Sequence, residues 1–156
     1  MKKKVSIMIP CYNEEQSLPL LYNELIKLVE SMDKYEWEFL FVNDGSSDKT
    51  LNILQEMHSK DNRCNYVDLS RNFGKEAAML AGIDYITGEC MIILDADLQD
   101  PPQLIPQMLE KWEEGYEAVC AVKKKSKEFF LMNSIRKFFY KFIEKHSDVN
   151  QIKHFD

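Results

Sequence analysis

The strongest constraint on the fold is a repeated change of period along the chain, from short apolar runs to segments with helical spacing. The β-branched and apolar run at residues 5–10 is followed by apolar residues that recur every three or four positions from Leu18 to Val29, as on one face of a helix. Chains that alternate strands and helices in this way form a parallel sheet with helices on both faces. We therefore expect an α/β fold.

Five strands and five helices are expected. The strands are residues 5–10, 39–42, 66–69, 91–94 and 118–122, and the helices are residues 18–29, 51–57, 75–86, 100–112 and 129–145. Residues 91–94 are apolar on both faces, which is typical of a strand buried in a parallel sheet. Asp48 and Asp100 are expected to cap the helices that follow them, and Gly115 to end the fourth helix.

The charge is unevenly distributed along the 156 residues. Residues 1–122 carry eleven basic and twenty-two acidic residues, whereas residues 123–145 carry eight basic and two acidic ones. The acidic part argues against nucleic-acid binding. No apolar run reaches the roughly 18 residues of a membrane span, and the basic start has no signal-peptide core after it, so we expect a cytoplasmic protein.

The sequence lacks the motifs of several classes of protein, which excludes these classes. The four cysteines have no C-x-x-C spacing, so we expect them to be reduced and mostly buried rather than zinc ligands. No dinucleotide-binding, P-loop or nucleophile-elbow motif is present.

Polar clusters follow the first four expected strands. They are residues 11–15, 43–48, 70–75 and 95–100. Ligands of open parallel sheets bind beyond the carboxyl ends of the strands. The sequence therefore predicts a single site built by four loops at this edge.

The cluster Asp95-Ala96-Asp97-Leu98-Gln99-Asp100 is the most informative of the four. Residues two positions apart in an extended chain point to the same side, so Asp95, Asp97 and Gln99 are predicted to direct oxygens at one point. Two carboxylates and an amide oxygen suit Mg²⁺ or Mn²⁺. The alternative is an ordinary turn at a strand end, with Asp100 as a helix cap.

The other loops offer groups for a nucleotide. Asp44 follows the second strand and is predicted to accept hydrogen bonds from a base or ribose, while Tyr12 offers a ring. Arg71 and Lys75 are cations that could pair with Asp97 or with a diphosphate. Alternatively, the polar residues of loops 11–15 and 43–48 only form turns and helix caps. Arg71 and Lys75 would then be ordinary surface cations at the start of a helix.

Together these residues resemble family 2 glycosyltransferases. Four motifs occur in the family's order: Val5-Ser-Ile-Met-Ile-Pro-Cys-Tyr-Asn-Glu-Glu15, Phe41-Val-Asn-Asp-Gly-Ser-Ser-Asp48, Leu69-Ser-Arg-Asn-Phe-Gly-Lys75 and Leu94-Asp-Ala-Asp-Leu-Gln-Asp-Pro-Pro102. Their combination is similar to the dolichyl- and undecaprenyl-phosphate sugar transferases. The resemblance implies a GT-A (Rossmann-like) fold, a UDP- or GDP-sugar donor, and inversion at the anomeric carbon.

The resemblance also implies roles for individual residues. Asp95 and Asp97 would be catalytic, and together with Gln99 would hold Mg²⁺ or Mn²⁺. The expected nucleotide-sugar contacts are Pro10, Tyr12, Asn13, Glu14, Asn43, Asp44, Arg71, Lys75, Asp95 and Ala96. Asn43 stands where many relatives have Asp, and Lys123 where Arg is frequent.

The last part of the chain departs from the family. Relatives continue past Val149 into an acceptor-side segment and transmembrane helices, so we expect this chain to be a fragment. Residues 1–122 would be the nucleotide-sugar-binding core and residues 123–156 a basic extension. The helix at 129–145 has an aromatic and a basic face, which favours contact with an anionic membrane or a missing part. The alternative is packing on its own sheet.

The expected activity is transfer of a sugar to a polyprenyl phosphate at the cytoplasmic face of a membrane, by a protein that could form homo-oligomers. The acceptor phosphate is already largely anionic at neutral pH, so little general-base help is needed. Two alternatives stay open. One is a phosphatase-like hydrolase with Asp95 as nucleophile; the other is a fragment that binds the donor without transferring its sugar.

Overall fold

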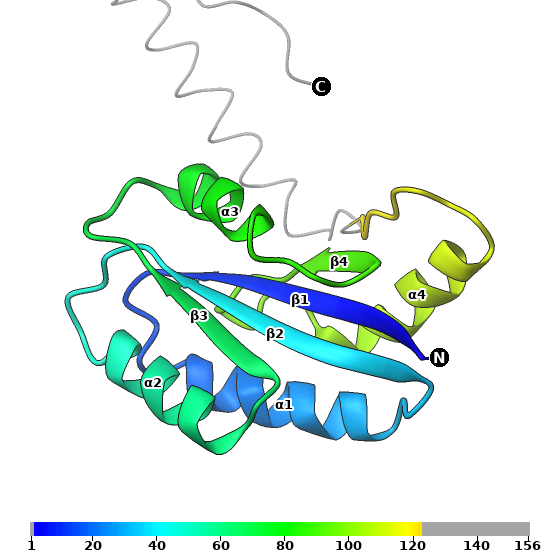
Figure 1. Cartoon of the computed structure of the whole chain (residues 1–156), viewed down its shortest axis with the longest axis horizontal. Coiled ribbons are helices and arrows are strands. Elements are labelled where there is room, and N and C mark those ends of the chain that lie inside the picture. Colours follow the sequence, from blue (N-terminus) through cyan, green and yellow to red (C-terminus); the bar gives the residue numbers. More distant parts are fainter. Residues whose placement is uncertain (1, 123–156) are drawn as a thin grey trace, which may run out of the picture. The chain divides into compact units, whose positions relative to one another are not determined.

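The computed structural model describes residues 2–122, which contain a four-stranded parallel sheet (Figure 1). The strands are β1 (Lys3–Cys11), β2 (Tyr35–Asn43), β3 (Cys64–Asp68) and β4 (Cys90–Ile93). The helices are α1 (Leu18–Glu30), α2 (Thr50–Lys60), α3 (Lys75–Ile83), the 3-10 turn η1 (Pro102–Leu104) and α4 (Ile105–Glu113).

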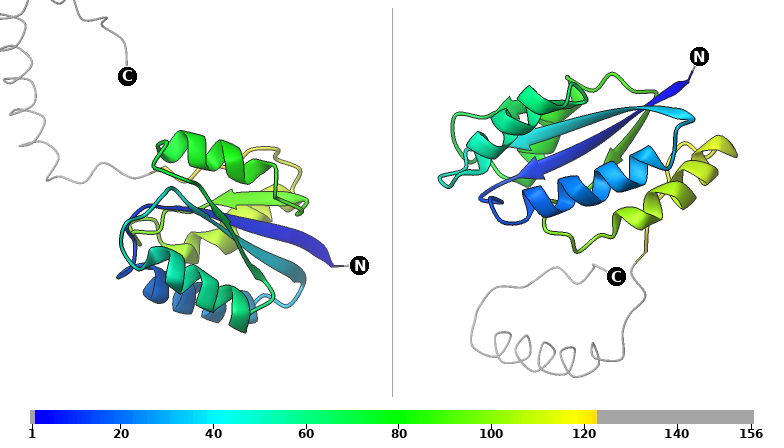
Figure 2. Two further views of the ribbon diagram at one scale, coloured as in Figure 1. Left: turned by 60° about the vertical axis from the view of Figure 1, so that its left-hand side comes forward. Right: turned by 90° about the horizontal axis from the view of Figure 1, so that it is seen from below.

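The strand order is β3-β2-β1-β4, and every neighbouring pair is parallel. Helix α3 covers one face of the sheet, whereas α1, α2 and α4 lie on the other face (Figures 1 and 2). Both the parallel sheet and the helices on its two faces are confirmed. The order reverses direction at β1, which has β2 on one side and β4 on the other. Ligands of open α/β sheets bind at such a reversal.

The core follows from the alternation of side chains along the central strand. Ile7 and Ile9 are fully buried in the larger apolar cluster, together with residues of α1, α2 and α4. Met8 points to the opposite face and packs with Ala78 of α3. A Cβ on Gly82 would lie 2.5 Å from the Met8 sulfur, so only glycine allows α3 to approach the sheet this closely.

A buried carboxylate, Glu38 on β2, holds the connection between α3 and β4. It accepts hydrogen bonds from the Ser6 hydroxyl at 2.5 Å, and from the backbone N–H and the hydroxyl of Thr87 at 3.1 and 2.8 Å. Lys4 lies 3.3 Å from the same carboxylate. Burial by itself raises the pKa of Glu38, but the hydrogen bonds from Ser6 and Thr87 outweigh it and leave the pKa below its ordinary value.

One expected strand is wrong, and one expected helix ends earlier than predicted. Residues 118–122 form no strand: the run is apolar, but no neighbouring strand pairs with it among the described residues, and propensity alone does not make a sheet. Cys120 is exposed as a result, so only Cys11 and Cys64 of the four free cysteines are fully buried. Helix α3 ends at Ile83 rather than residue 86, because the chain must turn to place Gly88 against Ser6.

Two expected caps also differ. The α2 helix begins at Thr50, and Asp48 accepts the Thr50 N–H at 2.9 Å from just outside the N-cap position. The fourth helix begins with the 3-10 turn η1, whose N-cap is Pro101, so the expected capping position of Asp100 is wrong by one residue. Gly115 follows α4 in the left-handed region, as expected.

Within the described residues, the part up to Tyr116 forms one compact unit. The expected helix at 129–145 and the expected extension at 123–156 lie outside the described residues. None of the helices in residues 2–122 combines the length and hydropathy that a membrane crossing requires.

We predict that Glu38→Gln destabilises the fold by about 1–3 kcal/mol at neutral pH, because a neutral amide cannot accept all of these hydrogen bonds. The folded pKa of Glu38 lies below its ordinary value of 4.5. The contribution of the charge is therefore complete above pH 4.5, and is lost as the pH falls through the lower folded value. Urea unfolding from pH 7 to pH 3 should show the difference between wild type and variant shrinking below pH 4.5.

Glu36→Gln is the matched control, because Glu36 lies on the same strand but is exposed. Its effect should stay within about 0.5 kcal/mol. A Glu38→Gln difference that is constant from pH 7 to pH 3 would contradict the assignment of a stabilising charge to Glu38.

Candidate functional site

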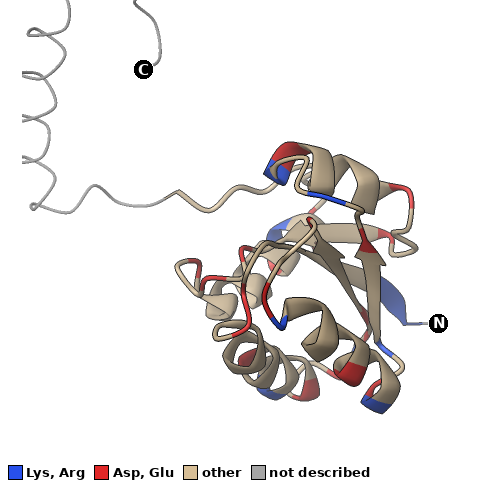
Figure 3. Ribbon diagram, turned by 90° about the vertical axis from the view of Figure 1, so that its left-hand side faces the viewer, with Lys and Arg blue, Asp and Glu red and all other residues tan. Residues whose placement is uncertain are grey.

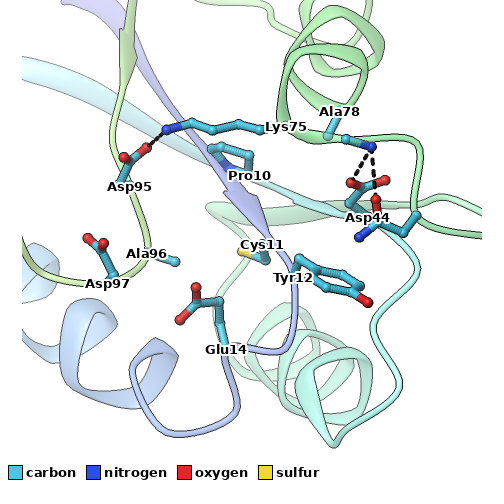
Figure 4. Close-up of a pocket in the computed structure, with 12 residues that line it drawn as sticks. Pro10, Cys11, Tyr12, Glu14, Asp44, Lys75, Ala78, Asp95, Ala96 and Asp97 are labelled. Carbon is cyan, nitrogen blue, oxygen red and sulfur yellow. Dashed lines mark hydrogen bonds and ion pairs between the residues drawn. The ribbon is translucent and has the colours of Figure 1, made fainter. Parts of the chain in front are cut away.

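A cavity of about 290 Å³ opens at the edge of the sheet where β1, β2 and β4 end (Figure 4). Its lining residues are Pro10, Cys11, Tyr12, Glu14, Asp44, Asn72, Gly74, Lys75, Ala78, Asp95, Ala96 and Asp97. All four of the polar loops contribute lining residues, so the structure brings the loops together as expected. The cavity lies beside the reversal of strand order at β1, where open α/β sheets bind ligands.

The loop after β1 supplies an aromatic ring and a carboxylate. Tyr12 is 47% exposed, which leaves a ring face available for stacking. The Glu14 carboxylate points into the cavity (Figure 4) and accepts a hydrogen bond from Ser17. Cys11 is buried at the base of this loop, and burial first, then the nearby charge of Glu14, raises the pKa of its thiol. Cys11 is therefore an inert, protonated part of the wall.

The loops after β1 and β2 are tied together by side chains that bond to the backbone. The Asn13 Oδ1 accepts the Ser47 N–H at 2.8 Å, and Asn13 itself has a positive φ of 58°. The Glu14 N–H donates to the Thr50 hydroxyl at 2.8 Å. Asn43, which is 1% exposed, accepts the Ser46 hydroxyl at 2.5 Å. Asn13 and Asn43 thus hold the loops and do not line the cavity.

Asp44 connects the loop after β2 to the loop before α3. It is only 3% exposed, and its two carboxylate oxygens accept the backbone N–H groups of Phe73 and Gly74 at 2.7 and 2.9 Å. Beside it, Gly45 has φ +63°, and a Cβ there would lie 2.3 Å from the Arg71 carbonyl carbon. Asp44 and Gly45 therefore fix the backbone that leads into α3.

The loop after β4 places two carboxylates at the cavity. Asp95 and Asp97 both line it, although residues 96 and 97 form a turn and not the extended chain that the sequence predicted. The chain then turns at Leu98, whose φ is +60°, and the Gln99 N–H donates to Asp97 at 3.0 Å. Gln99 is not a lining residue. Positive φ outside glycine is uncommon and gathers at functional sites.

Lys75 and Arg71 have different positions. The Lys75 ammonium lies 2.5 Å from Asp95 Oδ1, so its partner is Asp95 rather than Asp97. Arg71 lies over the Phe73 ring, 4.6 Å from its centroid, and is not a lining residue. The described cavity wall therefore carries four carboxylates and one ammonium group. Seen from this end of the sheet, several acidic segments lie on the loops (Figure 3).

Within residues 2–122, no three His, Cys, Asp or Glu side chains form a metal-binding group by themselves. A cation at Asp95 and Asp97 would need further ligands from water or from a bound phosphate, as is usual for Mg²⁺. The donor set fits a hard divalent ion, because carboxylate oxygens are the ligands such ions prefer and both Asp95 and Asp97 line one cavity.

Four lining residues were not expected from the sequence. They are Cys11, Asn72, Gly74 and Ala78. Cys11, Asn72 and Gly74 lie inside motifs that were recognised, so their neighbours carried a signal. Ala78 lies three residues after Lys75 and therefore on the same side of α3. Because the expected helix included both residues, helical spacing from Lys75 could have identified Ala78.

Comparison with known proteins identifies the family. The family model described as Glycosyl transferase family 2 matches residues 6–155. An uncharacterized glycosyltransferase of Bacillus subtilis (strain 168), YkcC, is 45% identical over 146 residues, covering 93% of this chain and 45% of that protein. The bactoprenol glucosyl transferase of Shigella phage SfX is 38% identical over 139 residues, covering 88% of this chain and 45% of that protein. The chain spans about half the length of these relatives.

Solved structures share the fold. Staphylococcus aureus TarS (residues 1–349), in complex with UDP, has a TM-score of 0.51 at 26% identity, covering 70% of this chain and 33% of that chain. The mannosyltransferase PcManGT of Pyrobaculum calidifontis, in complex with GDP-Man and Mn²⁺, has a TM-score of 0.57 at 23% identity, covering 87% of this chain and 39% of that chain. The expected GT-A fold is confirmed.

We predict that Asp44→Asn costs about 1–3 kcal/mol of unfolding free energy, because an amide NH₂ would face one of the two N–H donors. The amides of Phe73 and Gly74 should also exchange faster with solvent, since they lose a charged acceptor. Hydrogen exchange measured by NMR tests this. Asp33→Asn is the control, because Asp33 is exposed on the loop before β2. Unchanged exchange at both amides in Asp44→Asn would contradict the loop-holding role.

Proposed function

We propose, from the premise that the chain belongs to glycosyl transferase family 2, that its cavity binds a nucleotide diphosphate-sugar with a divalent cation. We further propose that the sugar passes to a polyprenyl phosphate. The chain spans 45% of the length of the bactoprenol glucosyl transferase it matches, so the activity, the acceptor and the partners of the whole protein belong to this proposal.

The observation that carries the proposal is the charge of the cavity wall. Four residues with a carboxylate and one with an ammonium group line the same space, whereas a nucleoside diphosphate is itself anionic. Such a wall binds a diphosphate only with additional positive charge. Mg²⁺ or Mn²⁺, held by Asp95 and Asp97 with Gln99 nearby, would neutralise the departing nucleoside diphosphate.

The remaining wall would position the donor. Tyr12 would stack on the base, while Pro10, Glu14 and Asp44 would surround the nucleoside. Ala96, which is buried between the two aspartates, would bring its backbone close to the sugar or phosphate. Asn13 and Asn43 would act through the loops they hold, because neither lines the cavity. Arg71 would act at the rim.

The reaction needs little from the protein besides positioning and charge. An oxygen of the acceptor phosphate, already anionic at neutral pH, attacks the anomeric carbon with inversion. The bond between that carbon and the diphosphate oxygen breaks, and the nucleoside diphosphate leaves with the electron pair. Residues at the cavity would hold the reacting atoms in line and stabilise the departing charge. No histidine lies in the described cavity wall.

A lipid acceptor would place the whole protein at the cytoplasmic face of a membrane. The division into a donor-binding core (1–122) and a basic extension (123–156) stays a prediction, as does a membrane contact through residues 129–145. Homo-oligomer formation also stays a prediction.

We predict that Asp97→Ala abolishes the increase in UDP or GDP affinity that Mn²⁺ produces in the wild type, because the variant loses a carboxylate ligand. Calorimetric titration with each nucleotide, with Mn²⁺ and with EDTA, measures the increase. Asp84→Ala is the control, since Asp84 is exposed at the end of α3, away from the cavity. Binding that is independent of Mn²⁺ in all three proteins would contradict the proposed metal site.

A second prediction concerns the acceptor. Transfer is measured as radiolabelled sugar that passes from UDP-glucose or GDP-mannose into the organic phase. It should occur with undecaprenyl phosphate and not with undecaprenol, because the phosphate oxygen is the nucleophile. Equal labelling of both lipids would exclude this mechanism. Donor binding without any transfer would favour a donor-binding module, and phosphate release from a simple ester would favour the hydrolase.

A further inference from the structure

The Lys75–Asp95 pair occupies a position that the proposed function needs for another purpose. Lys75 Nζ lies 2.5 Å from Asp95 Oδ1, and Lys75 is the one cation among the described residues that line the cavity. Asp95 is also one of the two carboxylates assigned to the divalent cation. Asp97, the other, has no cationic side chain paired with it within residues 2–122 (Figure 4). The metal and the ammonium group would thus compete for Asp95.

The backbone of Lys75 is held by its neighbours, whereas its side chain is half-exposed. Lys75 is the first residue of α3, and the two residues before it are bonded to the buried carboxylate of Asp44. The side chains of Lys75 and Asp95 are 50% and 35% exposed. Ion pairs with this exposure are weak, so Asp95 can exchange one cation for another at little cost.

We propose that Lys75 is an exchangeable counter-ion, which pairs with Asp95 before the ligands bind and moves to the donor diphosphate when Asp95 binds the divalent cation. This inference rests on the proposed function. When the divalent cation displaces the Lys75 ammonium group from Asp95, the ammonium group needs another anionic partner. The diphosphate of the bound donor is the strongest negative charge that the ligand brings into the cavity. No covalent bond is made or broken in this exchange.

The exchange has a consequence that a purely structural lysine would not have. Without nucleotide, Lys75 opposes metal binding, because it occupies a metal ligand. With nucleotide, Lys75 supports binding, because it contacts the phosphates. Metal and nucleoside diphosphate should therefore raise each other's affinity, and removal of the ammonium group should affect the two measurements in opposite directions.

The test replaces the ammonium group in Lys75→Met and compares the full chain with wild type. Mn²⁺ binding without nucleotide, measured by the electron paramagnetic resonance signal of free Mn²⁺, should become about two- to fivefold tighter, since an exposed pair is removed. Binding of UDP or GDP at saturating Mn²⁺, measured by calorimetry, should become about tenfold weaker, because a charged hydrogen bond is lost. Lys75→Arg keeps the positive charge and should restore both values toward wild type.

Lys60→Met is the matched control. Its ammonium group also lies 2.5 Å from a carboxylate, that of Glu56, but on α2 and outside the cavity wall. It should change neither measurement. Circular dichroism of each variant checks that the fold is retained.

The outcomes separate this inference from the proposed function. Wild type that binds neither Mn²⁺ nor a nucleoside diphosphate would overturn both. If wild type binds both, but Lys75→Met leaves the Mn²⁺ affinity or the nucleotide affinity unchanged, the exchange is overturned and the donor site remains intact. A Lys75→Met effect of the same sign in both measurements would also overturn it. Tighter Mn²⁺ binding together with weaker nucleotide binding, found in Lys75→Met and not in Lys60→Met, would support the exchange.

Discussion

The parallel pairing of β1 with two neighbours determines where this protein can act. Nine residues of β1 pair with β2, and four pair with β4 on its other side. The chain therefore leaves β1 in one direction and later returns on the opposite side, so the loops that follow β1 and β4 diverge and leave a cavity between them. Asp95 and Asp97 reach the cavity because β4 ends beside Met8, close to the end of β1.

The loops around the cavity are held mainly by side chains that bond to backbone groups of another loop. Asn13 bonds to Ser47, and Asp44 to Phe73 and Gly74. Such bonds orient a loop without apolar packing, which keeps the wall polar. They also concentrate acidic groups, because carboxylates are acceptors for N–H donors. A wall built in this way attracts cations first, and anionic ligands together with them.

The sequence predicted the parts of the fold that depend on local periodicity. Strand β4 was expected at residues 91–94 and lies at Cys90–Ile93, because a buried apolar run is a local signal. The strand expected at 118–122 does not form, since a strand requires a partner edge that the segment's own residues cannot supply.

At the site, the motifs identified the loops but not the partner of each side chain. Asp44 was expected to face a ligand, and it does line the cavity, yet its two oxygens accept N–H groups about 30 residues further along the chain. Lys75 was assigned to Asp97 or a diphosphate, and pairs with Asp95. Contacts between loops that are distant in sequence depend on the packing of the sheet and helices, which spacing within one motif does not encode.

We propose that four loops at one edge of the sheet form a single cation-dependent anion site. Titration of ¹⁵N-labelled protein with substoichiometric Mn²⁺ tests it most directly, because the paramagnetic ion broadens the amide signals nearest to it. We expect the signals of residues 11–14, 73–75 and 95–99 to broaden first. Addition of UDP or GDP should confine the broadening further to these residues. Broadening centred on the acidic residues of α2 or α4, with the cavity signals unaffected, would contradict a cation site in this cavity.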